Sequence, residues 1–310
     1  MRIEPDMTIH RPMKNLCLVD LDQPAEGFRN FISSWIFIIG DCTVVVDPGP
    51  CSSIPILLYA LKSCGVKKVR YILLTHVHID HAGGAGLLLK HCPDAQVICH
   101  PDGIRHMINP ARLWERSVKA LGKIAEMYGE IEPVPERNIA YRDNIEVGEI
   151  VINALKTPGH TSHHLCYRAG DILFGGEAMG VTYPVKEGFY LRIATPPVFK
   201  HEIYRDSLRM IASLGVSCVC FAHYGCRHDV QNVFDTALNQ LDNWIAIVKK
   251  HYSQGKEMSC KNIFDEILKN DRGMADFHSL PEDVQNRERH FAFNSIRGMN
   301  DCLIREKDMK

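Results

Sequence analysis

Four potential metal ligands crowd together where a short apolar run ends. Residues 71–84 read Y-I-L-L-T-H-V-H-I-D-H-A-G-G, which places His76, His78, Asp80 and His81 within six residues. The apolar run is typical of a buried strand, where side chains repeat every two residues, so His76 and His78 point the same way. Asp80 and His81 face a second point as the chain turns into a Leu-rich helix. Three imidazoles and a carboxylate suit zinc or iron far better than calcium or magnesium.

The pattern H-x-H-x-D-H resembles the signature of the metallo-β-lactamase superfamily. This resemblance implies an α/β protein with an αββα sandwich, and metal-dependent hydrolysis as its activity. It also implies further ligands at the ends of later strands, and two fitting segments follow. The segment T-P-G-H-T-S-H-H, residues 157–164, presents His160 after a Pro-Gly turn, and A-H-Y-G presents His223 at the end of an apolar strand.

The resemblance implies a centre for two divalent ions, zinc first, with iron or manganese as alternatives because imidazole and carboxylate ligands bind all three. The expected ligands are His76, His78 and His160 for the first ion, Asp80, His81 and His223 for the second, and Glu177 for both. A hydroxide activated between the ions would attack an acyl carbon or a phosphorus atom. Asp80 is the expected catalytic residue, acting as a ligand and as the group that orients the water.

Glu177, in L-F-G-G-E-A-M-G, departs from the family pattern, which usually has aspartate at this position. Glutamate carries the same charge on one more methylene group, so it can still coordinate, but the metal spacing and the room for substrate must change. Three outcomes are open. They are a bridging glutamate with a reshaped pocket, a site with one metal ion, and a glutamate that blocks the pocket of a protein without turnover.

Two residues are expected to support the ligands. In the family an aspartate at the place of Asp47, in V-V-V-D-P-G-P, commonly hydrogen-bonds the ligand loop, and an ordinary turn aspartate is the alternative. His164 matches the position of a supporting histidine in glyoxalase-II-like and lactonase-like members. Either His163 or His164 could be taken for a ligand instead, and His163 has no assigned role.

The elements around these residues follow from apolar alternation, turn signals and helix caps. Besides the run before His76, strands are predicted in segments 15–21, 31–39, 43–47, 96–100, 149–156, 165–168, 172–174 and 216–221. Helices are predicted in segments 52–64, 199–214, 230–252, 262–269 and 281–305. The alternation indicates a layered catalytic domain over residues 1–228. Residues 229–310 carry no strand signal and indicate a helical extension, packed on the sandwich or used in dimer contacts.

Two segments are candidates for covering the substrate. Residues 110–128 show an amphipathic helical stripe, which suits a lid and a core-facing helix equally well. Residues 183–199, Y-P-V-K-E-G-F-Y-L-R-I-A-T-P-P-V-F, are too irregular for a strand or helix and too apolar for a plain surface loop. Long loops beside a site often carry substrate contacts, so Tyr183, Tyr190 and Arg192 are the expected substrate-binding residues.

The composition indicates which partners and which cellular location to expect. The 36 basic and 37 acidic residues nearly cancel, so no global field favours nucleic acid or an anionic membrane. The first residues do not resemble a signal peptide, and the apolar runs are too short to span a bilayer, so a cytoplasmic location is expected. The 12 cysteines are scattered and expected to be reduced. Cys218, Cys220 and Cys226 flank His223, but cysteine in an apolar strand is more often a small hydrophobic residue than a thiolate ligand.

These observations predict a metal-dependent hydrolase acting on an ester, thioester or lactone of a small molecule. A phosphodiesterase or nuclease of the same superfamily is one alternative, which the balanced charge disfavours because phosphate backbones demand a positive surface. The other alternative is a non-catalytic metal-binding regulator whose pocket Glu177 restricts. No nucleic-acid or membrane partner is expected, and a homodimer is open.

Overall fold

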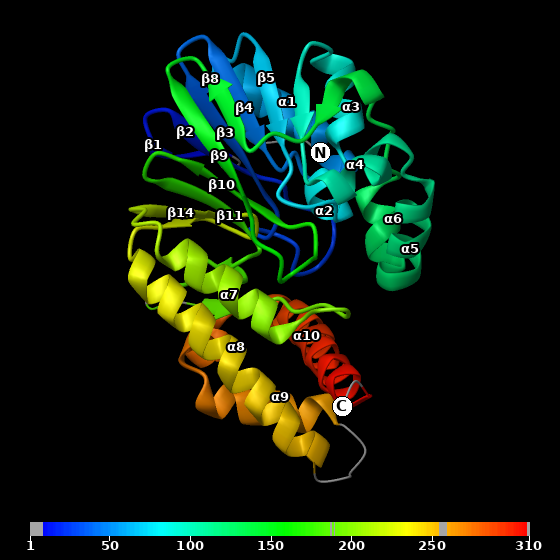
Figure 1. Ribbon diagram of the computed structural model, residues 1–310, viewed down its shortest axis with the longest axis vertical. Coiled ribbons are helices and arrows are strands. Elements are labelled where there is room, and N and C mark those ends of the chain that lie inside the picture. Colours follow the sequence, from blue (N-terminus) through cyan, green and yellow to red (C-terminus); the bar gives the residue numbers. More distant parts are fainter. Residues whose placement is uncertain (1–8, 187, 189, 254–258, 309–310) are drawn as a thin grey trace.

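Two β-sheets pack face to face, and helices cover both outer faces (Figure 1). The computed structural model describes residues 9–186, 188, 190–253 and 259–308. The arrangement is the αββα sandwich that the sequence predicts, followed by a helical region at the C-terminal end. The predicted fold class is therefore confirmed.

The first sheet has the strand order β1-β2-β3-β4-β5-β6-β7. Its strands are β1 (Ile9–Met13), β2 (Leu16–Asp20), β3 (Ser33–Ile39), β4 (Cys42–Val46), β5 (Val69–Leu73), β6 (Gln96–Ile98) and β7 (Ile139–Ala140). The pairs from β1 to β4 are antiparallel, and those from β4 to β7 are parallel. The predicted Gly40-Asp41 turn joins β3 to β4, with Gly40 at a φ of 58° that glycine adopts without strain.

The second sheet has the order β15-β14-β11-β10-β9-β8. Its strands are β8 (Asn144–Val147), β9 (Ile150–Lys156), β10 (Leu165–Ala169), β11 (Ile172–Gly176), β14 (Cys218–Phe221) and β15 (Cys226–Arg227). The neighbours β11 and β14 are parallel, so the loops that follow them leave the sheet at the same edge.

The helices form the outer layers and the C-terminal region. They are α1 (Ile54–Ser63), α2 (Ile79–Ala82), α3 (Ala85–His91), α4 (Pro101–Ile108), α5 (Ala111–Leu121), α6 (Lys123–Tyr128), α7 (His201–Ala212), α8 (Val230–Ser253), α9 (Cys260–Asn270) and α10 (Glu282–Asp308). Short 3₁₀ turns lie at Cys51–Ser53, Glu136–Asn138 and Arg272–Ser279. Among the described residues, no helix is both long enough and apolar enough to cross a bilayer.

Three apolar clusters hold the layers together. Leu57 of α1 and Leu88 of α3 pack with Val45 on the outer face of the first sheet. Trp35 and Phe174 meet between the two sheets. The third cluster joins the outer face of the second sheet to α7 and to the C-terminal helices α8, α9 and α10. The C-terminal region therefore shares its core with the sandwich instead of folding around a core of its own.

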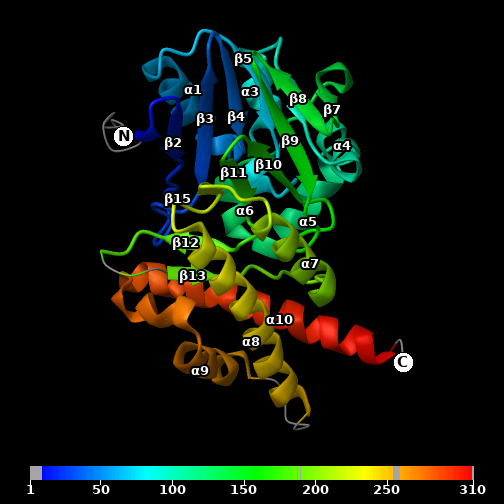
Figure 2. The same cartoon turned by 60° about the vertical axis from the view of Figure 1, so that its left-hand side comes forward.

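The structure corrects the prediction for residues 183–199. Part of this segment is not irregular, because β12 (Val181–Tyr183) pairs antiparallel with β13 (Tyr190–Arg192) in a two-stranded ribbon. Figure 2 shows α10 running alongside this ribbon. Residues 110–128 form two helices, α5 and α6, because the chain breaks at Gly122 with a φ of 55°. The sequence patterns do not predict the strand β1.

Candidate functional site

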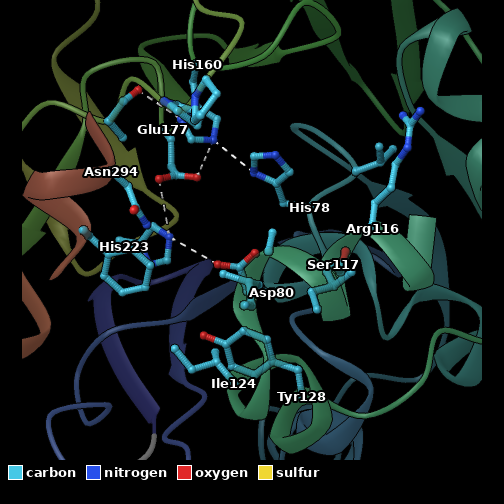
Figure 3. Close-up of a pocket in the computed structure, with 18 of the residues that line it drawn as sticks. His78, Asp80, Arg116, Ser117, Ile124, Tyr128, His160, Glu177, His223 and Asn294 are labelled. Carbon is cyan, nitrogen blue, oxygen red and sulfur yellow. Dashed lines mark hydrogen bonds and ion pairs between the residues drawn. The ribbon is translucent and has the colours of Figure 1, made fainter. Parts of the chain in front are cut away.

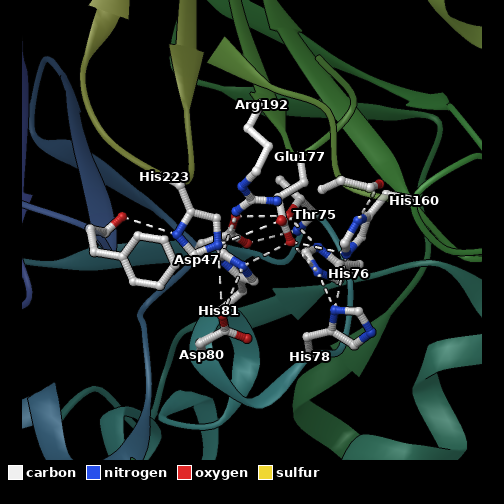
Figure 4. A network of polar contacts seen from close by, with 12 residues as sticks. Asp47, Thr75, His76, His78, Asp80, His81, His160, Glu177, Arg192 and His223 are labelled. Carbon is white, nitrogen blue, oxygen red and sulfur yellow. Dashed lines mark hydrogen bonds and ion pairs between the residues drawn. The ribbon is translucent and has the colours of Figure 1, made fainter. Parts of the chain in front are cut away.

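The expected ligands come from the ends of strands in both sheets. Thr75 and His76 follow β5, and Asp47 follows its parallel neighbour β4. Glu177 follows β11, and His223 follows its parallel neighbour β14. Because parallel neighbours end at the same edge of a sheet, these loops converge in the space where the two sheets' edges meet. Figure 4 shows the resulting network of side chains.

The first group consists of His76, His78, His160 and Glu177, whose ligand atoms lie within 4.8 Å of one another. His78 Nδ1 lies 3.0 Å from His76 Nε2 and 3.1 Å from His160 Nε2. Glu177 Oε2 lies 3.3 Å from His76 Nε2 and 3.0 Å from His160 Nε2. The connection between β9 and β10 brings His160 to residues far from it in the sequence.

The second group consists of Asp80, His81 and His223, and its ligand atoms also lie within 4.8 Å of one another. Asp80 Oδ2 lies 3.5 Å from His81 Nε2 and 3.6 Å from His223 Nε2. Glu177 reaches this group as well, with Oε2 at 3.3 Å from His81 Nε2 and Oε1 at 3.6 Å from His223 Nε2. The longer glutamate side chain therefore spans both groups.

Hydrogen bonds on the far side of the rings determine which nitrogens can bind a cation. His160 Nδ1 donates to the Ala194 carbonyl at 3.1 Å, and His223 Nδ1 donates to the Phe31 carbonyl at 3.0 Å. A carbonyl oxygen only accepts, so both Nδ1 atoms carry the proton. The Nε2 lone pairs of both rings then face the ligand groups, which is the usual arrangement of histidines that bind metal.

Asp47 fixes His76 in the same way through Thr75. The Thr75 backbone N–H and hydroxyl donate to the two Asp47 carboxylate oxygens at 2.8 and 2.7 Å. The hydroxyl proton is thereby used, so the Thr75 oxygen accepts from His76 Nδ1 at 3.0 Å and leaves His76 Nε2 with a lone pair. Asp47 holds a left-handed backbone with a φ of 51°, a strained conformation for a non-glycine residue.

His81 provides the clearest test of whether the groups fit a cation. Both of its ring nitrogens are buried without a hydrogen-bond partner among the described residues. Burial lowers the pKa of His81, but the carboxylates of Asp80 and Glu177 outweigh it and raise the pKa to about 9. The neighbouring carboxylates therefore favour a positive charge at this point. A bound cation would supply that charge, and the imidazole and carboxylate donors suit zinc, iron or manganese.

His76, His78 and Glu177 have the protonation states that metal binding requires. Burial, together with the neighbouring His78 and His81, holds the pKa of His76 well below its ordinary value, so this ring stays neutral. Burial also lowers the pKa of His78 to about 3. Burial acts to raise the pKa of Glu177, but His160 and His223 outweigh it and hold that pKa well below the ordinary value. Glu177 is therefore ionised.

His164 lies behind the ligands. Its Nε2 accepts from the Glu177 backbone N–H at 3.2 Å, and its Nδ1 contacts Thr157 Oγ1 at 2.8 Å. Since both ring nitrogens are engaged, His164 holds the Glu177 backbone and offers no lone pair to a cation. His163 lies on the pocket wall, and its Nε2 is buried without a partner among the described residues.

A cavity of about 520 Å³ lies in front of the ligands and includes His78, Asp80, His160, Glu177 and His223 in its lining (Figure 3). Glu177 forms part of the wall of this cavity. Of the three residues expected to bind substrate, only Arg192 lines this cavity. The other two are buried elsewhere: the Tyr190 hydroxyl donates to Glu288 at 2.8 Å, and Tyr183 lies under the Arg287 guanidinium.

Much of the cavity wall comes from residues that the sequence did not single out. The helices α5 and α6 contribute Leu113, Ile124 and Tyr128, whereas α10 contributes Phe291 and Asn294. The amphipathic stripe of residues 110–128 is the sequence pattern that could have identified the residues of α5 and α6. This stripe faces the cavity, as the stripe of a lid would. No sequence pattern indicates that the α10 residues line the cavity, because they reach it only through the packing of this helix along β13.

Comparisons with known proteins agree with this geometry. The sequence model of the metallo-beta-lactamase superfamily matches residues 28–223. The metallo-beta-lactamase fold-containing protein ST1585 of Sulfurisphaera tokodaii is 29% identical over 190 residues, which are 59% of this chain and 69% of that protein. A hydroxyacylglutathione hydrolase of Xanthomonas campestris pv. campestris is 28% identical over 194 residues, which are 61% of this chain and 59% of that enzyme.

Solved structures give the same fold. The metallo-beta-lactamase family protein TTHA1429 from Thermus thermophilus has a TM-score of 0.66 at 19% identity, covering 95% of each chain. The crystal structure of ST1585 has a TM-score of 0.65 at 22% identity, covering 94% of this chain and all of the other. The family match extends over most of the sandwich and includes both ligand groups. The chain belongs to the metallo-beta-lactamase superfamily.

Proposed function

We propose that this protein is a metal-dependent hydrolase that cleaves esters or thioesters with an apolar acyl group. The observation that carries the proposal is the cavity of about 520 Å³, in which apolar side chains such as Leu113, Ile124 and Phe291 face the ligand groups. Pockets that bind small molecules are mostly apolar, with a few polar groups that orient the ligand. The similarity to a protein named hydroxyacylglutathione hydrolase supports a thioester.

Each of the two ligand groups is proposed to bind one metal ion. His76, His78, His160 and Glu177 would hold one ion, and Asp80, His81 and His223 a second, with Glu177 in reach of both. When bound, such ions polarise a carbonyl oxygen and lower the pKa of a bound water toward neutrality. Zinc is the proposed metal, with iron and manganese as alternatives.

Two side chains of the chain itself are placed to assist the reaction. The Asp80 carboxylate lines the cavity and remains 18% exposed, so it can orient a water toward the acyl carbon. Figure 3 shows Tyr128 on the same side of the cavity as Asp80. Burial and the Asp80 charge raise the pKa of Tyr128 well above its ordinary value, so its hydroxyl stays protonated. It can therefore donate a hydrogen bond to an oxygen that gains charge.

The mouth of the cavity favours a substrate with an anionic portion. Arg112 and Arg116 lie one turn apart on α5, and both line the cavity. Neither forms an ion pair with another described residue. Burial lowers the pKa of His106, and the nearby charges of Arg105, Arg116 and Arg112 lower it further. Paired guanidinium groups bind carboxylates and phosphates, so the alcohol or thiol part of the substrate is proposed to be anionic.

A series of thioesters tests the apolar acyl site. The metal-loaded protein is assayed with acetyl to octanoyl thioesters of N-acetylcysteamine, following the loss of thioester absorbance. Each buried methylene contributes about 0.8 kcal/mol, so kcat/KM should rise about fourfold per carbon until the cavity is full. Ile124→Ala should flatten this rise, whereas Ile203→Ala, at an exposed position outside the cavity, should leave it unchanged. Turnover of phosphodiesters without turnover of any acyl substrate would refute the proposal.

A second comparison tests the anionic portion. The double variant Arg112→Gln/Arg116→Gln should raise the KM for octanoyl-coenzyme A at least tenfold and leave the KM for the uncharged N-acetylcysteamine thioester unchanged. Lys123→Gln removes a charge from the neighbouring helix outside the cavity lining and serves as the control. An equal effect of the double variant on both thioesters would show that the arginines do not bind the substrate's charge.

A further inference from the structure

Three cysteines and a histidine gather on the edge hairpin of the second sheet. Cys218 begins β14, Cys226 begins β15, and His228 follows β15. His223 lies at the other end of β14, five residues beyond Cys218, which is about 16 Å along an extended chain. The group is therefore separate from the ligands described above, and none of its members lines the cavity.

The hairpin register places these side chains together. Cys220 pairs with Cys226 and Val219 pairs with Arg227, and continuing this antiparallel register places His228 opposite Cys218. Alternate residues of a strand share one face, so all four side chains point the same way. The sulfur atoms of Cys218 and Cys226 and a ring nitrogen of His228 lie within 4.8 Å of one another. The Cys218 thiol also interacts with the Cys220 thiol.

The chemistry of the group suits a soft or borderline divalent cation. His228 Nδ1 donates to the Ser217 carbonyl at 3.3 Å, which leaves a lone pair on its other ring nitrogen. Two thiolates neutralise the charge of a divalent cation. This neutralisation is needed because Cys218 belongs to the apolar core between the sheets, where an unbalanced charge is costly. A tetrahedral zinc site with bonds of about 2.3 Å sets its sulfurs about 3.8 Å apart, so adjustments of about 1 Å complete the site.

We propose that Cys218, Cys226 and His228 bind a zinc-class cation, with Cys220 as the thiol placed to complete a set of four ligands. The cation joins the start of β14 to the end of β15 and closes the hairpin whose turn carries His223. Binding releases the thiol protons to solvent, as thiolate coordination requires. The site has a structural role, because it links the two strands at the edge of the sheet, where β15 spans only Cys226–Arg227.

Cobalt substitution tests the proposal in the full-length protein. The two ligand groups at the cavity contain no sulfur, so a thiolate-to-cobalt charge-transfer band in the near ultraviolet reports only on the hairpin site. The band should appear in the wild type and in His160→Ala, and it should be absent from Cys226→Ser. Cys92→Ser, which changes another half-buried thiol outside the hairpin, should keep the band.

Metal analysis gives an independent measurement. The zinc content of Cys226→Ser should fall by one equivalent, with Cys92→Ser unchanged. Exposed His228 gives a second variant that leaves the core intact, and His228→Ala should weaken or shift the cobalt band. A wild type that shows no thiolate band and holds no more zinc than Cys226→Ser would overturn the proposal. Because these readouts need no substrate, they stand apart from the test of hydrolysis.

Discussion

The ion cluster around Glu288 allows a quantitative prediction. Glu288 Oε2 accepts from the Tyr190 hydroxyl at 2.8 Å and from Arg192 Nε at 2.6 Å, and its Oε1 accepts from Arg287 Nε at 3.0 Å. The carboxylate is completely buried, and Arg192 and Arg287 are 3% and 4% exposed. Glu288→Gln keeps the shape of the side chain but leaves two buried guanidinium groups without their counter-charge.

Two lines of reasoning give a similar loss of folding free energy for Glu288→Gln. Burial acts to raise the pKa of Glu288, but Arg192 and Arg287 outweigh it and lower the pKa from 4.5 to about 2. At about 1.4 kcal/mol for each tenfold change in proton affinity, this lowering of the pKa corresponds to roughly 3–4 kcal/mol of stability. Breaking one partner of a buried ion pair costs about 3–5 kcal/mol in other proteins. We therefore expect Glu288→Gln to lose about 3 kcal/mol at pH 7.

The pH dependence has a definite sign. A carboxyl group with a lowered pKa in the folded state stabilises the protein fully above its unfolded pKa of about 4.5, and this contribution disappears as the pH falls toward 2. The difference between wild type and Glu288→Gln should therefore shrink below pH 4.5.

Urea unfolding at pH 7, 5 and 3 measures this difference, with Glu282→Gln at an exposed position of the same helix as the control. The control should change the free energy of unfolding by less than about 0.5 kcal/mol. A loss below about 1 kcal/mol for Glu288→Gln at pH 7 would contradict the counter-charge argument, and so would a loss that stays constant down to pH 3.

Three further predictions concern the ligands and the pocket wall. His160→Ala should remove at least one equivalent of metal and most of the turnover, and unchanged occupancy in elemental analysis would contradict its assignment as a ligand. Glu177→Asp should keep both ions and widen the range of acyl groups accepted, which the thioester series measures; loss of both ions would mean that the length of the glutamate is required. In Gly298→Ala the added carbon would lie 2.0 Å from the Thr195 carbonyl oxygen, so α10 must shift. Thermal unfolding should show a loss of about 1–3 kcal/mol, and an unchanged melting temperature would argue against this close packing.

Sequence patterns predicted the part of the site whose ligands are close neighbours in the chain. The spacing of His76, His78, Asp80 and His81 encodes their directions because neighbours in a strand or turn are fixed by backbone geometry. His160, Glu177 and His223 are far apart in the sequence, and the resemblance to a known family was needed to group them. Their common position follows from the parallel pairing of strands, which periodicity alone does not reveal.

The remaining features depend on packing between distant segments. The ribbon of β12 and β13 was missed because each strand is only three residues long and gains its burial from the C-terminal helices. The break between α5 and α6 depends on a single residue, Gly122, inside a continuous amphipathic stripe. Arg192 lines the cavity, but its ion-pair partner Glu288 lies 96 residues away in the sequence, so no local pattern could reveal what holds it there.

The position of α10 has a consequence for how proteins of this kind acquire new specificities. The family pattern ends at residue 223, yet Phe291, Asn294 and Ser295 of α10 form part of the wall that a bound molecule would touch. Part of the cavity wall is thus encoded outside the stretch that encodes the two ligand groups. Substitutions in α10 can therefore reshape this wall without touching a ligand, so two homologues with identical ligands can have cavities of different shape.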